Sequence, residues 1–365
     1  MNMKRILLFL LLIAMILPAQ ADELPLPDAH PTPVPLSAQI TPDGLLTITH
    51  IRTLRDQNVP DFLAEIKGLT GVKVLDMRSV RMSTEAMVAV HEGLEGITLQ
   101  CMVPMGENDP VDSTLTDLNL DAMKGRIYYT HFMGALQVMT GLTHVTMYNH
   151  SFKIPQMEDI LVKYPHIAFD WTIHLDNYKI RTDSTAFSTW KGTQEPRYTA
   201  EDLDVLKYCK NLLALDVGHN NVYDLSFIPR YWPKLRWLIC IGSKRKLTDI
   251  SPLAGLEDLE YLELFTQNIT DISALANKKK LTDLNLVLND ITDLTPLHSC
   301  TNLQRVFISL NRHLPQEQID ALQRALPNCR INYTVDHPTG DYWRVGSHYE
   351  TMIEAFTSRT YIPLP

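Results

Sequence analysis

Four histidines in the N-terminal part of the sequence are the residues best suited to binding a metal ion. His144 and His166 are 22 residues apart, and His131 and His150 lie near them in the sequence. If His144 and His166 occupy the same outward position of neighbouring strands, their side chains lie about 5 Å apart, close enough to share a metal. The alternative is that they are exposed histidines on a polar strand face. We favour the alternative, so we predict no metal or other cofactor.

Other residue types give little support for catalysis. The sequence has no glycine-rich phosphate loop, nucleophile elbow, HExxH motif or zinc-ligand spacing. Carboxylates are plentiful, but those of the C-terminal half recur at turn or outer positions of a repeat. No pair is therefore marked as the acid and base of a glycosidase. We predict that the protein is not an enzyme.

Leucines at fixed spacing indicate the elements that carry these residues. LEYLELFTQNITDISAL from Leu259 aligns with LTDLNLVLNDITDLTPL from Leu281, a period of 22 residues. Further copies begin at Leu212, Leu235, Leu303 and Leu326. A unit with leucines at positions 1, 4, 6 and near 11 cannot bury them alone, so it must stack on copies of itself. The alternation around Glu263 predicts a short strand in each unit, and stacked strands form one parallel sheet.

Amide side chains recur at the next inward polar position, where they can bond the backbone of the turn that leaves each strand: Asn220, Gln267, Asn289 and Asn311. The stretch from Leu212 to Tyr333 resembles internalin-type bacterial leucine-rich-repeat proteins. The resemblance implies an α/β fold, a leucine-rich-repeat solenoid (a right-handed β-α superhelix) with a parallel concave sheet. It implies a binding scaffold and leaves the ligand open.

The outward positions of the regular strands form the candidate binding site. A concave face that meets only water should be polar, yet here many outward residues are apolar, and soluble proteins seldom expose such a patch without a purpose. Trp, Tyr and Arg also dominate interface energy. The predicted ligand-binding residues are Trp237, Ile239, Ile241, Tyr261, Glu263, Phe265, Asp283, Val287, Arg305 and Phe307. The alternative is that the leader, the hairpin or the C-terminal tail folds over this face and buries it.

The five cysteines include no CxxC pair, so neither a disulfide framework nor a zinc site is indicated. Cys240 and Cys329 fall on inward repeat positions. Cys209 and Cys300 lie four strands apart, roughly 19 Å, beyond the reach of a disulfide. We predict small core residues and no disulfide.

The N-terminus has the features of a signal peptide. Lys4 and Arg5 precede an apolar run from Ile6 to Leu17, and Ala19-Gln20-Ala21 offers a cleavage site. Twelve apolar residues are fewer than the ~20 that a spanning helix needs. We therefore predict a secreted or cell-surface protein with no membrane insertion after cleavage. Cleavage moves the net charge from −9 to −11, which disfavours nucleic acid as a partner.

The remaining chain divides into five expected segments. Residues 22–44 form a proline-rich leader, and residues 45–170 are degenerate leucine-rich repeats with central strand positions Leu75, Ile97, Leu118, Val145 and Ile167. Helical spacing between these strands, with starts near Ser83 and Pro155, predicts convex helices. Alternation around Asp176-Asn177 predicts a hairpin insertion over 171–197. Residues 198–333 are regular 22-residue repeats, and residues 334–365 form a C-terminal cap over the last repeat.

Together these patterns predict a non-catalytic secreted protein that binds a protein ligand, on a host or a bacterial surface, through its concave face. The alternative is a structural component of the cell envelope that assembles with itself. The oligomeric state is left open, and an enzyme ranks third.

Overall fold

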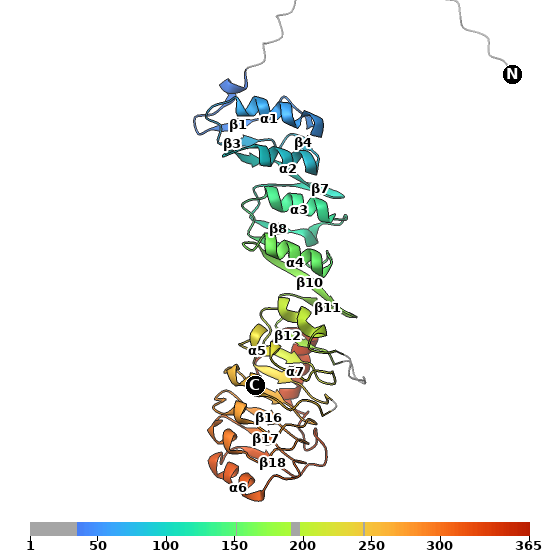
Figure 1. Ribbon diagram of the computed structural model, residues 1–365, viewed down its shortest axis with the longest axis vertical. Helices are drawn as coiled ribbons and strands as arrows, with labels where there is room; N and C mark the ends of the chain where they lie inside the picture. The colour runs from blue at the N-terminus through green and yellow to red at the C-terminus, as the bar shows by residue number, and fades with distance from the viewer. Residues whose placement is uncertain (1–34, 151, 191–197, 244) are drawn as a thin grey trace, which may run out of the picture.

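The computed structural model describes residues 35–150, 152–190, 198–243 and 245–365 of the chain. The predicted signal peptide and most of the predicted leader lie outside these residues. The described chain is an elongated stack of coils that narrows near β10 and β11 (Figure 1). Its strands lie on one side of the coils, as the leucine periodicity predicts, because the inward side chains of each coil are buried against the next.

The described residues of the N-terminal half form a three-stranded parallel sheet and a four-stranded mixed sheet whose last strand is antiparallel, with a hairpin between the two sheets. The first joins β1 (Leu45–Thr47), β3 (Val74–Asp76) and β5 (Thr98–Gln100). The hairpin is β6 (Met102–Met105) with β7 (Asn108–Asp112), and β2 (Thr53–Leu54) pairs with β4 (Arg81–Met82). The second sheet has the order β11-β10-β9-β8, with bounds Tyr178–Arg181, Ala168–Leu175, His144–Met147 and Asp117–Asn119. The concave sheet of this half is therefore interrupted.

Four helices cover the outer side of the described part of this half: α1 (Val59–Lys67), α2 (Thr84–Gly93), α3 (Tyr129–Val138) and α4 (Ile154–Lys163). The predicted helix starts are confirmed. The Ser83 hydroxyl accepts a hydrogen bond of 3.0 Å from the Ala86 amide, which caps α2. Pro155 lies in the first turn of α4, where the missing amide proton costs nothing. Gly134 lets α3 approach α2 closely, since a Cβ there would lie 2.4 Å from Thr84.

Two strands of this half lie two residues later than predicted. Leu75 pairs with Leu99, and Val145 pairs with Phe169. Leu99 and Phe169, rather than Ile97 and Ile167, therefore take the central strand positions. Each interval is 24 residues instead of 22 because a helix of ten residues, α2 or α4, and its loop replace the short outer turn of a regular repeat.

The hairpin predicted around Asp176-Asn177 is present between β10 and β11, and Asp176 has a positive φ of 54° in its turn. Its flanks are not an insertion outside the repeats. β10 pairs with β9 in the N-terminal half, and β12 (Ala186–Ser188) begins the next sheet. That parallel sheet continues through β13 (Ala214–Asp216), β14 (Trp237–Ile239), β15 (Tyr261–Glu263), β16 (Asp283–Asn285), β17 (Arg305–Phe307) and β18 (Arg330–Asn332).

The amide ladder joins the coils of this C-terminal half as predicted. The Asn289 side chain donates to the carbonyls of Leu264 (2.9 Å) and Leu286 (3.0 Å) and accepts from the Ile269 amide (3.1 Å). Asn311 repeats these bonds one coil later, donating to Leu286 and Ile308. A residue with positive φ precedes each of these side chains, including Thr266, Leu288 and Leu310. The amides therefore satisfy the backbone of a tight left-handed turn.

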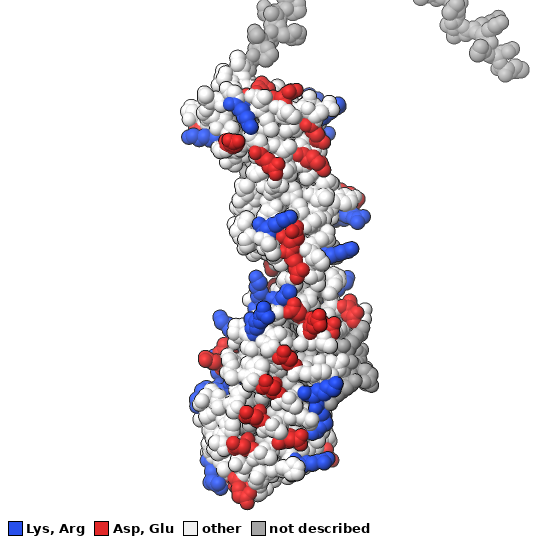
Figure 2. All heavy atoms as spheres, in the orientation of Figure 1, with Lys and Arg blue, Asp and Glu red and all other residues white. Residues whose placement is uncertain are grey.

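The outer side of the C-terminal half consists of short turns. It holds α5 (Phe227–Tyr231) and the 3₁₀ segments η4 (Asp202–Tyr208), η5 (Ser251–Gly255), η6 (Ser273–Leu275) and η7 (Thr295–Ser299), and α6 (Gln316–Ala325) follows β17. Asp249, Asp271 and Asp293 each accept a 2.8 Å bond from the amide two residues later. Figure 2 shows acidic side chains following one another down this half. The repeat accounts for them as turn-forming residues.

The C-terminal segment extends further than a cap over the last repeat. It leaves β18 and places Trp343 over the outward residues of β15 and β17, and then α7 (Ser347–Ser358) runs back toward β12. In Figure 1 this red segment lies against the yellow strands of the same half. Tyr349, Met352, Ile353 and Phe356 recur at helical spacing, so α7 has one apolar face to bury. We call residues 334–365 the tail.

The cysteines lie in the core of the repeats, as predicted. All five cysteines are buried and free, and burial raises the pKa of the Cys101, Cys209, Cys240 and Cys329 thiols to about 12. Within the described residues, no helix has both the length and the apolar character needed to cross a bilayer.

Candidate functional site

The register of the predicted binding residues is confirmed. Trp237, Tyr261, Asp283 and Arg305 pair in one row across β14 to β17, and Ile239, Glu263, Asn285 and Phe307 pair in the next. The tail, however, covers both rows. Trp237, Tyr261, Val287 and Phe307 are at most 1% exposed, and Ile239, Ile241 and Phe265 are also buried. The exposed apolar patch that motivated the predicted site is therefore absent. The alternative is correct instead: the C-terminal tail folds over this face and buries it.

Glu263 is the centre of the polar contacts that hold the tail. Its carboxylate is fully buried, yet it accepts a 3.0 Å bond from the Trp343 indole and a 2.6 Å bond from the Arg344 guanidinium. The Tyr261 hydroxyl also donates to it. A buried carboxylate is tolerated only when it is paired and hydrogen-bonded. The tail supplies two of its three partners, so the polar groups of this face and the tail complement each other.

Asp283, also fully buried, makes a second set of contacts with the tail. It pairs with Arg305 on the neighbouring strand and with His348 of α7, whose Nδ1 lies 3.4 Å from its carboxylate. Burial raises the pKa of Asp283, but the close approach of the His348 ring and the charge of Arg305 outweigh burial and lower it. The proximity of Asp283 in turn raises the pKa of His348. Nearby, Asn285 donates a 2.8 Å bond to the Pro338 carbonyl.

The end of the tail is fixed at the first strand of the same sheet. The Arg359 carbonyl accepts bonds from the Thr185 amide (3.1 Å) and the Ala186 amide (3.2 Å). The Tyr361 hydroxyl donates to Glu260 over 2.6 Å, and its ring lies 4.9 Å from that of Trp237. The tail thus bonds to both ends of the regular sheet and spans the rows between them.

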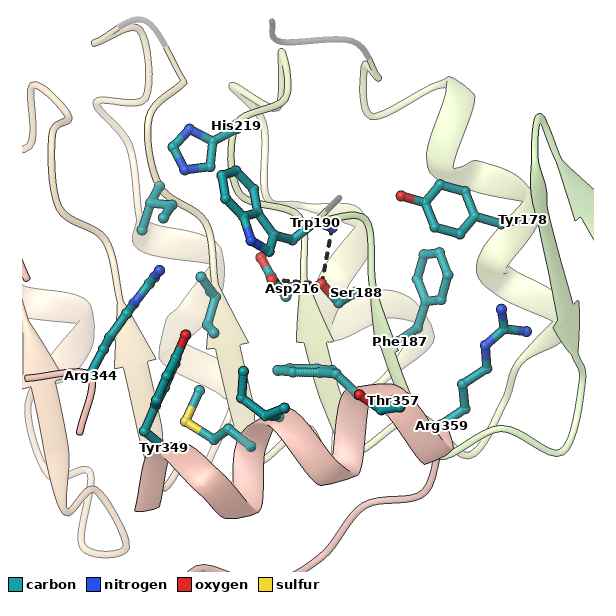
Figure 3. A pocket seen from close by; sticks show the side chains of 15 residues that line it. Tyr178, Phe187, Ser188, Trp190, Asp216, His219, Arg344, Tyr349, Thr357 and Arg359 are labelled. Atoms are coloured by element: carbon teal, nitrogen blue, oxygen red, sulfur yellow. Dashed lines mark hydrogen bonds between the residues drawn. The ribbon is translucent and has the colours of Figure 1, made fainter. Parts of the chain in front are cut away.

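One pocket remains open between α7 and the start of this sheet. It has a volume of about 330 Å³, and we call it the tail pocket. Tyr349, Met352 and Phe356 of α7 line it on one side, and Phe187 of β12, Ile239 of β14 and Ile241 just after β14 also line it. Figure 3 shows Tyr349 on α7 and Phe187 on the sheet. Ile239 and Ile241 are the only members of the predicted site that line it. The pocket combines apolar walls with polar and charged side chains, and binding sites usually combine the two.

Polar groups of the tail pocket come from β12, β13 and the turn that follows, and also from the tail, which contributes Arg344, Tyr349, Thr357 and Arg359. Asp216 accepts a 2.7 Å bond from the Ser188 hydroxyl and a 2.9 Å bond from the Gly218 amide. Burial raises the pKa of Asp216, and burial lowers the pKa of His219. A side chain at Gly218 would collide with Ile241, with Cβ 2.7 Å from its Cγ1. The glycine therefore keeps this side of the pocket open.

Aromatic and apolar side chains remain exposed at the rim of the tail pocket. Trp190 is 45% exposed and lies against His219 with a ring-centre distance of 4.6 Å, and Ile353 is 50% exposed. Neither residue was among those predicted. The helical spacing of the apolar residues of α7 was available in the sequence as a signal, whereas Trp190 lies just after a strand of the sheet that the repeat pattern did not identify.

The concave face of the N-terminal half is open and polar. His144 lies between two carboxylates from neighbouring strands, with Nδ1 2.5 Å from Asp117 and Nε2 2.9 Å from Asp170. The bond with Asp117, followed by that with Asp170, raises the pKa of His144. No other segment of the described chain buries this row, and Asp117 keeps 61% of its side-chain surface exposed.

The pairing of His144 with His166, which the sequence analysis considered as a metal site but did not favour, does not form, because the register places Ala168 beside His144. His166 precedes β10 by two residues and packs near Tyr164 instead. His150 bonds the Leu120 carbonyl over 2.7 Å. No group of three metal-ligating side chains with suitable geometry is found among the described residues.

Comparison with known proteins gives likenesses of fold. No protein-family model matches the sequence, and no curated protein is similar to it. Among solved structures, an internalin (inlF) from Listeria monocytogenes is 20% identical over 76% of this chain and 67% of its own, with a TM-score of 0.36. A leucine-rich-repeat protein from Leptospira interrogans is 16% identical over 74% of each chain, with a TM-score of 0.37. The repeats and their register make this chain a leucine-rich-repeat solenoid, similar to internalins in its repeats.

Proposed function

We propose that this chain is a non-catalytic, exported scaffold that binds another protein, and that the partner docks at the rim of the tail pocket. The observation that carries the proposal is the exposure of Trp190 and Ile353 beside a cavity walled by α7 and the sheet. Large apolar and aromatic side chains that surround a pocket are the usual energetic centres of protein interfaces. The concave face as a whole is not proposed as the docking surface, because the tail occupies it.

The rigidity of the surroundings supports this choice. Trp190 donates its backbone amide to the Ser188 hydroxyl over 3.0 Å, and that hydroxyl bonds Asp216. On the opposite wall, the segment that leads into α7 is fixed by the contacts of Trp343 and Arg344 with Glu263. A surface whose side chains are already held in place loses less entropy when a partner binds.

A photo-crosslinking experiment tests the docking surface. The full chain would carry benzoylphenylalanine in place of Trp190 or Ile353 and would be exposed to surface proteins of host cells or of the producing cell. The matched control has the same group in place of Val162, which is 79% exposed on α4 of the other half. We expect discrete adducts from positions 190 and 353 and none from 162. Equal labelling at all three positions, or none at any, would contradict the proposal.

A second candidate is a structural role through self-association, and the edge of the long sheet favours it. β18 is the last strand of that sheet, pairs only with β17 among the described strands, and is followed by Tyr333, which is 45% exposed. An unpaired edge can accept a strand of another copy. Light scattering that shows a mass increasing with concentration, and a loss of that increase in Ile331→Pro, would support this role over hetero-recognition.

A further inference from the structure

Three carboxylates face the tail from the concave side of the regular sheet, and their surroundings differ. Glu263 is bonded by Arg344, and Asp283 is paired with Arg305 and His348. Asp216 receives only neutral donors, from Ser188 and Gly218. Within the described parts of the chain, no cation lies at ion-pair distance from Asp216. Arg344 of the tail therefore neutralises Glu263 and Arg305 of β17 neutralises Asp283, whereas Asp216 has no ion-pair partner among the described residues and Arg344 acts on it only from beyond ion-pair distance.

The tail pocket opens onto this third carboxylate. Asp216, Trp190 and Tyr349 all line it, and Figure 3 shows Asp216 below the Trp190 ring with Tyr349 across the pocket. Asp216 is half-buried, and a half-buried carboxylate gains more from a cation than a fully exposed one does. Aromatic faces beside a carboxylate add attraction for the same charge. The pocket thus has the composition of a site for a cation on an apolar stem.

The two arginines of the pocket do not fill this role. The Arg344 guanidinium is bonded to Glu263 over 2.6 Å, so the pair carries no net charge. Arg359 lies at the other end of the pocket, beyond Phe187 in the view of Figure 3. An incoming cation would meet Asp216 next to a neutral pair rather than next to a free guanidinium.

We propose that the tail pocket receives a basic side chain of the partner protein, with its ammonium or guanidinium group on Asp216 and its methylene stem against Ile239, Met352 and Phe356. The proposal rests on the proposed protein-binding function and names the chemistry of its anchor. The volume of about 330 Å³ accommodates one long side chain. Basic residues pack their apolar stems on apolar surface while the charged end finds its partner.

The test uses capped amino acids as probes for the full chain. Lysine acetylated at its α-amino group and methylamidated at its carboxyl group, which keeps the side-chain ammonium, is titrated into the protein. Norleucine capped in the same way, which has a similar stem without the charge, and free pentylamine are titrated for comparison. Binding is followed at the Gly218 amide resonance, because this amide donates to Asp216. We expect the capped lysine to bind on the order of tenfold more tightly than the capped norleucine, as for a charge pair shielded from water.

Two variants link the selectivity to the pocket. Asp216→Asn keeps the size of the side chain and an acceptor for Gly218, so it should fold and lose the preference for the charged probe. Trp190→Leu should lower the affinity for the charged probe several-fold while leaving the Asp216 carboxylate in place. Asp336→Asn is the control, since the Asp336 side chain is 95% exposed in the tail and outside the pocket. It should leave both affinities unchanged.

Each other outcome overturns the inference. Equal affinity for capped lysine and capped norleucine, or unchanged selectivity in Asp216→Asn, would show that the carboxylate recognises no cation. Tighter binding of pentylamine than of capped lysine would reject a partner's side chain in favour of a free amine. Crosslinked adducts at positions 190 and 353 that persist in Asp216→Asn would leave the docking surface intact and reject only the basic anchor.

Discussion

The concave faces of the two halves of the solenoid differ in polarity and in exposure to solvent. In the N-terminal half, neighbouring strands present Asp117, His144 and Thr146, and the face is open to solvent. In the C-terminal half, the equivalent rows present Trp237, Ile239 and Tyr261, and the tail covers them. Both halves bury their inward leucines by stacking. The difference teaches that an apolar concave row is not by itself a binding surface, because a chain can supply its own cover.

The cover is specific as well as apolar. The tail brings Trp343 and Arg344 to Glu263 and brings His348 to Asp283, so it pairs the charges that its own face buries. The open half needs no such partner, since Asp117 and Asp170 bond His144 on their own face. The polar contacts of the C-terminal half therefore identify the tail as a constant part of the fold rather than an incidental contact.

The largest expected effect comes from removing the central anchor of the tail. Trp343→Ala should lower the free energy of unfolding of the C-terminal half by about 3 to 5 kcal/mol, as for a large buried aromatic residue. Tyr342→Ala is the matched control, because Tyr342 is 73% exposed, and it should cost less than about 0.5 kcal/mol. Denaturant titration followed by tryptophan fluorescence measures both. Similar small effects for the two variants would show that the tail does not stabilise the C-terminal half and would contradict the contrast between a covered and an open concave face.

The next effect compares outward and inward residues within one strand of each half. Leu262→Ala and Leu118→Ala both remove inward leucines and should each cost about 2 to 5 kcal/mol. Tyr261→Ala should also destabilise by about 2 kcal/mol or more, because its ring is 1% exposed under the tail. Asp117→Ala, at the corresponding outward row of the open half, should cost less than about 1 kcal/mol. A Tyr261 variant as stable as the parent would mean that the tail does not cover the face in solution.

The smallest expected effect is a pH dependence that differs between the halves. Because the pKa of His348 is raised in the folded chain, its pairing with Asp283 stabilises fully below the unfolded histidine pKa of about 6.5. That stability is lost as the pH rises through the raised pKa. The lowered pKa of Asp283 acts at the other end, and its contribution is lost as the pH falls through that value. The tail is therefore held best between the two.

Dye binding to apolar surface measures this effect. Fluorescence of a hydrophobic dye should increase slightly above about pH 6.5, and His348→Gln should remove the dependence. His144→Gln is the matched control, because the pKa of His144 is also raised but its row covers no apolar surface. If His144→Gln instead of His348→Gln removed the pH dependence of the dye fluorescence, the effect would arise in the N-terminal half and the prediction would be wrong.

The regular repeats were predictable from the sequence because each coil repeats the same inward leucines and the same amide. That periodicity gave the strand register from Leu215 to Phe307, the amide ladder and the buried cysteines. The predicted strand positions in the N-terminal half were wrong by two residues at Leu99 and Phe169 because ten-residue helices and their loops replace the short outer turn of a regular repeat. The predicted site failed for a different reason. Periodicity shows that Tyr261 and Trp237 point outward, but it cannot show which distant segment packs there.

The tail carried its own signal in the spacing of Tyr349, Met352, Ile353 and Phe356, which required an apolar surface elsewhere in the chain. The complementarity of Arg344 and Glu263 could not be read from the sequence, since 81 residues separate them and several other carboxylates were available. Trp190 was missed because the sequence pattern placed it in an insertion instead of beside the first strand of the regular sheet.

Hydrogen exchange on the full chain tests most directly whether the tail is part of the C-terminal half. If the tail covers the concave face, the amides of α7 should be protected together with those of β13 to β17 and should lose protection with them in Trp343→Ala, because cooperative units open as one. The strands of the N-terminal half should exchange at unchanged rates in that variant. Rapid exchange of α7 in the unmodified chain, beside slow exchange of β13 to β17, would show a tail that does not close over the sheet and would contradict the account.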